Sequence, residues 1–87
     1  MDGVSADGTL LDAKGLGYAN FVASNGDFQP WFNGQYSLID QAERQVAAAQ
    51  GQPIQWSVAE PSAATAIQNL LSGQGIKGIS VIYQPPK

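Results

Sequence analysis

The sequence predicts an α/β domain in which a β-hairpin is followed by a helix, a strand, a helix and a strand around a mixed sheet. Three observations lead to this fold class. An Asp-Gly turn lies between two β-like runs near the start, two later stretches repeat apolar residues with helical spacing, and a short β-like run follows each of them. The last strand–helix–strand unit predicts a parallel crossover. Because the chain has 87 residues, we expect one domain over residues 1–87.

The hairpin is expected to have strands over residues 2–6 and 9–14. Asp7 and Gly8 lie between them, and this dipeptide strongly favours a tight hairpin turn. The length of the loop is left open by the sequence, and it decides the register of the two strands.

The register in turn decides whether two carboxylates can meet. A two-residue loop would pair Asp2 with Ala13, whereas a three-residue loop would place Asp2 opposite Asp12 on the same face. In the second register Lys14 shares that face, because side chains alternate along a strand. Leu11 and Ala13 are then expected to point into the core.

The first helix is expected to begin at Ser37. Ser37 and Asp40 have the spacing of a capping box, and Gly51 suits the end of the helix. One helical face would carry apolar residues, namely Ile39, Ala42, Val46 and Ala49.

The second half of the chain predicts a strand, a helix and a strand. The strand is expected over Ile54–Ala59, because its apolar residues alternate with polar ones. Pro61 suits the first turn of a helix, and Gly73 or Gly75 would close it. The last strand is expected over residues 78–83. The buried stripe of the helix would consist of Ala63, Ala64, Ile67, Leu70 and Leu71.

The composition excludes several kinds of chemistry. The chain contains no Cys and no His, so thiolate nucleophiles, Ser-His-Asp triads and the usual zinc sites are excluded. Catalysis would have to use carboxylates, Lys, Tyr or a metal held by oxygen ligands. The net charge is −3 with four cations, which argues against strong non-specific binding of nucleic acid. No stretch is apolar enough for a membrane span.

Asp2, Asp12, Ala13 and Lys14 form a pattern that fits a metal-dependent phosphodiesterase. Two carboxylates from adjacent strands and the carbonyl of Ala13 would hold a divalent cation such as Mg²⁺ or Mn²⁺. The cation would activate water, and Lys14 would orient the water and stabilise charge on the phosphate. The alternative interpretation is a hairpin with a charged, solvated face on a non-catalytic α/β interaction module.

Three stretches of the chain resemble a known family of bacterial toxins. They are "DGVSADGTLLDAKGLGYANF", "DQAERQVAAAQGQPIQWSVAE" and "GIKGISVIYQPP", and together they run from Asp2 to Pro86. The chain resembles the PD-(D/E)xK, or restriction-endonuclease-like, nuclease superfamily and within it restriction endonuclease fold toxin 5. The resemblance implies a restriction-endonuclease-like core and a polymorphic-toxin nuclease, most often a DNase. Such a toxin is secreted, acts in the cytoplasm of competitor bacteria and is neutralised by a cognate immunity protein.

The resemblance also implies roles for single residues. Asp2 matches the first motif acid, Asp12 the second and Lys14 the motif lysine. Members of the superfamily often carry a Gln on the following helix that faces the site. Gln41 and Gln45 are one turn apart and both fit, and we expect Gln41 to serve the site.

The chain departs from the superfamily pattern at two points. The second acid is Asp12, where Glu is frequent. The superfamily core also begins with a helix and a strand before the first acid, whereas Asp2 is the second residue here. We therefore expect a truncated core, the C-terminal portion of a nuclease toxin domain, whose sheet is completed by an upstream segment or by another chain. Whether such a fragment is active alone, and whether it cuts DNA, RNA or nucleotides, is left open by the sequence.

Overall fold

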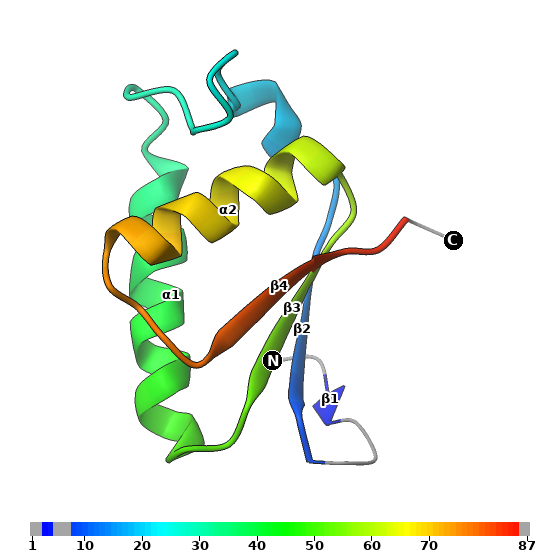
Figure 1. Cartoon of the computed structure of the whole chain (residues 1–87), viewed down its shortest axis with the longest axis vertical. Helices are drawn as coiled ribbons and strands as arrows, with labels where there is room; N and C mark the ends of the chain where they lie inside the picture. The colour runs from blue at the N-terminus through cyan, green and yellow to red at the C-terminus, as the bar shows by residue number, and fades with distance from the viewer. Residues whose placement is uncertain (1–2, 5–7, 86–87) are drawn as a thin grey trace.

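The predicted order of elements is confirmed. The computed structural model of the protein describes residues 3–4 and 8–85, and Figure 1 shows their arrangement. The elements in chain order are β1 (Gly3–Val4), β2 (Leu10–Lys14), the 3-10 helix η1 (Tyr18–Phe21), α1 (Gly34–Ala49), β3 (Ile54–Val58), α2 (Pro61–Gly73) and β4 (Ile79–Tyr83).

The four strands form one mixed sheet in the order β1-β2-β3-β4. β1 is antiparallel to β2, and β2, β3 and β4 are parallel to one another. Gly3 pairs with Leu11 and Val4 pairs with Leu10, which is the register of the three-residue-loop alternative. Gly8, the last loop residue in that alternative, has a φ of 89°, a left-handed backbone conformation that glycine adopts readily. Asp2 itself lies outside the described residues.

Both helices lie on the same side of the strands (Figure 1). The residues of β3 that face the helices, among them Trp56, are fully buried, and their neighbours in β3 are only partly buried. On β2 the buried residues are Asp12 and Lys14, whereas Leu11 is partly exposed and Ala13 is exposed. The expectation that Leu11 and Ala13 point into the core is therefore wrong. The helices cover the opposite face, so the charged pair takes the inner positions.

Helix α1 begins at Gly34, three residues before the expected start. Ser37 lies inside the helix and forms no capping box. The first turn is closed by backbone hydrogen bonds in which the carbonyls of Phe32 and Asn33 accept from the amides of the residues three positions later. The buried residues of the helix are Leu38, Ala42, Gln45 and Ala49, whereas Ile39 and Val46 are only partly buried. The expected face was thus rotated by part of a turn, because it counted only apolar residues and left out a buried Gln45.

Helix α2 and the last two strands agree with the predicted bounds to within a residue, but Leu70 of the expected stripe is only partly buried and Ala66 is buried in its place. The helix begins at Pro61 and ends at Gly73, with Ala63, Ala64, Ala66, Ile67 and Leu71 buried. Together with the inner residues of β3 and with Phe28, Leu38 and Ala42, they form one continuous apolar core between the sheet and the helices. This core holds β2 firmly beside α1, and the candidate site lies between these two elements.

Candidate active site

A buried ion pair lies on the inner face of β2. The ammonium of Lys14 donates to Oδ2 of Asp12 at 3.1 Å, and the two residues are 7 % and 8 % exposed. They are two positions apart on a strand, so both side chains leave the same face. The aromatic ring of Trp56 lies below the lysine, with Nζ 4.4 Å from its centroid, which adds a cation–π contact.

Gln45 joins this pair to the core. Its amide nitrogen donates to Oδ2 of Asp12 at 2.7 Å, and its amide oxygen accepts from the indole nitrogen of Trp56 at 2.8 Å. Gln45 is 9 % exposed and Trp56 is fully buried, so the bridge satisfies polar groups that water does not reach. Trp56 was not singled out by sequence reasoning. The alternation of apolar residues along the strand predicts that Trp56 is buried, but it does not predict the hydrogen bond to Gln45.

Gln41 lies one turn before Gln45 and contacts the other member of the pair. Its side-chain oxygen accepts a hydrogen bond from Nζ of Lys14. Unlike Gln45, it is exposed, so Lys14 lies between a buried carboxylate and a solvent-facing amide. The structure thus brings Asp12, Lys14 and Gln41 together, and Gln45 lies with them.

The oxygen atoms near Asp12 suit a hard divalent cation. Both described donors to Asp12 use Oδ2, so neither Lys14 nor Gln45 takes Oδ1. The amide of Leu10 and the carbonyl of Lys14 bond toward β3, so in a parallel ladder the carbonyl of Ala13 faces the β1 side. A carboxylate and a backbone carbonyl are the ligand types that Mg²⁺ accepts.

No group of three or more acidic side chains suited to a metal occurs among residues 3–4 and 8–85. The predicted site needs only two acids and a carbonyl, and its first acid, Asp2, lies outside that range. The search for groups of three acids therefore does not test the geometry of the predicted metal site.

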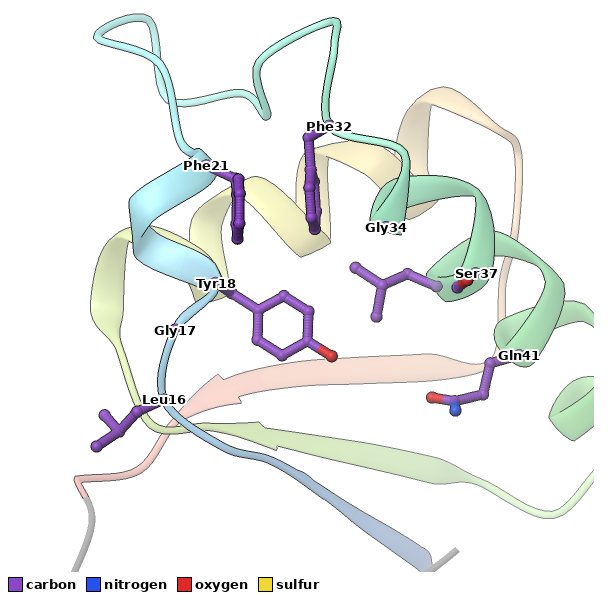
Figure 2. A pocket seen from close by; sticks show the side chains of 9 residues that line it. Leu16, Gly17, Tyr18, Phe21, Phe32, Gly34, Ser37 and Gln41 are labelled. Carbon is purple, nitrogen blue, oxygen red and sulfur yellow. The ribbon is translucent and has the colours of Figure 1, made fainter.

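An aromatic pocket of about 450 Å³ adjoins the cluster (Figure 2). The ring of Tyr18 extends from η1 toward α1, with its hydroxyl group on the side of Ser37 and Gln41. Phe21 and Phe32 stack on each other above it, with ring centroids 4.2 Å apart. Gln41 lines the pocket and also accepts the hydrogen bond from Lys14, so this residue connects the pocket to the ion pair.

Glu60 fixes the loop that carries this pocket. Its carboxylate accepts hydrogen bonds from the backbone amides of Gly17 and Ala19, both at 3.0 Å. Glu60 is also the residue before α2, where it makes no side-chain cap. It therefore connects the end of β3 to the start of η1 and holds Tyr18 in place.

The comparison with known protein families decides the identity of the fold. The model of the family described as restriction endonuclease fold toxin 5 matches residues 1–61. The chain belongs to this family. No curated protein and no solved structure matches the chain.

Membership makes the chain a toxin with a restriction endonuclease fold, and such toxins are nucleases that act on nucleic acid. The matched segment contains β1, β2, α1 and β3, and therefore Asp12, Lys14, Gln41 and Gln45. It ends at Pro61, so it is shorter than the resemblance over 2–86 suggested, and most of α2 and all of β4 lie beyond it. None of the toxin's helices in the described ranges is long and apolar enough to cross a membrane.

Proposed function

We propose that this toxin hydrolyses phosphodiester bonds of DNA with the help of a divalent metal ion, Mg²⁺ or Mn²⁺. One observation carries the proposal. On a sheet face otherwise packed with apolar side chains, β2 presents Asp12 and Lys14, and Gln41 of α1 reaches the lysine. This is the arrangement expected of a PD-(D/E)xK nuclease, and family membership supports it.

In the proposed mechanism some residues hold the cation, and others act on the attacking water and the phosphate. Asp2, Asp12 and the carbonyl of Ala13 would hold the cation, and Lys14 would orient the attacking water and balance charge on the phosphate. The cation, when bound, supplies a Lewis acid and lowers the pKa of water. Gln41 would fix the ammonium of Lys14 and contact water or phosphate.

The biological setting follows the family. The toxin would be a secreted bacterial effector that acts on DNA, rather than RNA, in the cytoplasm of a target cell. A cognate immunity protein would neutralise it. That residues 1–87 are the C-terminal portion of a larger toxin domain, whose sheet an upstream segment or another chain completes, remains a prediction.

Cleavage of supercoiled plasmid DNA tests the proposal. We expect nicking with Mg²⁺ or Mn²⁺, none with a chelator, and loss of activity in Asp12→Asn and Lys14→Met. Asp12→Asn keeps the size of the side chain and Lys14→Met keeps most of its length, but each leaves the other charge of a buried ion pair without its partner, which costs about 3–5 kcal/mol of stability. Lys77→Met is the matched control, because Lys77 is exposed in the loop before β4. A circular dichroism melt of each variant separates loss of activity from loss of folding.

The outcomes discriminate between the functions. Equal activity of folded Lys14→Met and wild type would refute the assigned site. Activity that appears only with the upstream segment restored would support the fragment prediction. Absence of cleavage of DNA and RNA in both forms would favour an interaction module, in which the hydrogen bonds to Oδ2 of Asp12 serve stability alone.

A further inference from the structure

We infer that the aromatic pocket beside Gln41 binds an unpaired nucleobase, so that the toxin prefers single-stranded or locally unpaired nucleic acid. This inference rests on the proposed nuclease function and names the form of its substrate. Apart from Gln41, the residues that line the pocket lie outside the PD-(D/E)xK pattern, in η1, the loops on either side of it and the first turns of α1.

The size and walls of the pocket fit a base. About 450 Å³ lies within the range of small-ligand pockets. Tyr18, Phe21 and Phe32 supply aromatic surface, and stacking on such surface is how proteins hold unpaired bases without sequence preference. A base inside a duplex cannot enter a pocket of this kind, because its faces are already stacked.

Polar groups stand at one side of the pocket, as recognition of a base edge requires. The hydroxyl group of Tyr18 points toward Ser37 and Gln41 (Figure 2). Neither the hydroxyl of Tyr18 nor that of Ser37 makes a hydrogen bond with another described residue. Gln41 still has its amide donor, because only its oxygen is used by Lys14. These groups offer a donor and acceptor set to a base edge.

The pocket also has the right neighbour. Gln41 lines it and accepts from Lys14, so a nucleotide whose base stacks beside Tyr18 would have its phosphate on the lysine side. The pocket would therefore position the strand for the reaction proposed at Asp12.

The charge of the protein makes stacking necessary. Three of the four cations lie in the described ranges; of these, Lys14 pairs with Asp12, and Arg44 pairs with Asp40 at 3.0 Å. A protein that neutralises few phosphates gains little from counterion release. Contacts with bases would then supply much of the affinity for nucleic acid, and the aromatic pocket offers such contacts next to Gln41, the partner of Lys14.

Fluorescence anisotropy measures binding of nucleic acid by the protein, and a chelator in the buffer prevents metal-dependent cleavage during the titration. A labelled single-stranded oligonucleotide, its blunt duplex and a strand with abasic sites throughout are titrated with wild type, Tyr18→Leu and Tyr36→Leu. Tyr36 is 62 % exposed and does not line the pocket, so it is the matched control. We expect wild type to prefer the single strand, and Tyr18→Leu to lose affinity roughly 5- to 150-fold, the effect of one lost base stack. The slope of log affinity against log salt should be only about −1 to −2.

Equal binding of the single strand and the abasic strand, or no binding of either, would overturn the inference, and this comparison needs no variant. If Tyr18→Leu does not fold, Tyr18→Phe, which loses only the hydroxyl group, is expected to weaken binding less than removal of the bases does. Base-dependent binding without metal-dependent cleavage would support base binding by the pocket and refute the proposed nuclease function. Cleavage of duplex DNA with no preference for unpaired bases would keep the nuclease and refute the pocket.

Discussion

Replacing Gln45 by Leu is expected to destabilise the fold strongly, although the new side chain is apolar and similar in size. Gln45 is the bridge between the carboxylate of Asp12 and the indole of Trp56. The substitution removes both hydrogen bonds at once. It leaves the indole N–H of Trp56 in a place that water does not reach.

The magnitude follows from the two contacts. A hydrogen bond to a charged group contributes about 1.5–3 kcal/mol, and an unsatisfied buried donor costs about 1–3 kcal/mol. Burial of the added apolar surface returns about 1–2 kcal/mol. The net loss in the free energy of unfolding is therefore about 2–4 kcal/mol, out of a total that is about 5–15 kcal/mol for native proteins.

Urea unfolding followed by far-ultraviolet circular dichroism measures this loss. The midpoint of Gln45→Leu should fall by roughly 1 to 3 M, given the usual dependence on urea for small domains. Gln68→Leu is the matched control, because it makes the same change at an exposed position of α2 where the side chain makes no described hydrogen bond. Its expected loss is below about 1 kcal/mol, since no buried polar group loses a partner. If Gln45→Leu unfolds at the wild-type midpoint, the bridge is not a stabilising contact and the reasoning is refuted.

Three further predictions concern the surroundings of the site. Glu60→Ala should speed hydrogen exchange at the amides of Gly17 and Ala19 and cost about 1–3 kcal/mol of stability, whereas Glu60→Gln should keep most of the protection. Gly34→Ala should destabilise by about 1 kcal/mol instead of stabilising the helix, because the added methyl group meets the ring of Phe32; a higher melting temperature would contradict this. The double variant Asp12→Leu, Lys14→Met should be more stable in urea than either single variant, because neither charge is left buried without a partner, yet show no nuclease activity.

The order of the elements could be predicted because each one has its own period in the sequence. β3 alternates, α2 repeats apolar residues at helical spacing, and Pro61 and Gly73 mark its ends as the structure has them. The start of α1 could not be predicted. The stretch before α1 is rich in aromatic residues that follow no regular spacing. The first turn of α1 is closed by backbone hydrogen bonds, which no particular residue type predicts.

The neighbourhood of Asp12 and Lys14 could be predicted in part from the sequence, whereas their burial could not. Spacing placed Asp12 and Lys14 on one face, and the family resemblance pointed to Gln41, whose side chain does contact Lys14. The same reasoning put that face in solvent, because charges are usually outside. Which face of a sheet its helices cover is decided by the chain connections, and a five-residue strand does not reveal it. The aromatic pocket could not be predicted from the sequence either, since its walls come from a loop and two helices that meet only in the folded chain.

The burial of Asp12 and Lys14 bears on function because it brings no general gain in stability. A buried ion pair is often no more stabilising than apolar residues of the same volume, since desolvation offsets the attraction. Here the fold adds an amide bridge, a second amide and an aromatic ring to satisfy the pair. Local rules of protein sequence are broken most often where chemistry needs the exception. Because Gln45, Gln41 and Trp56 support a charged pair that gains little stability from burial, we assign the proposed nuclease reaction to this part of the described chain.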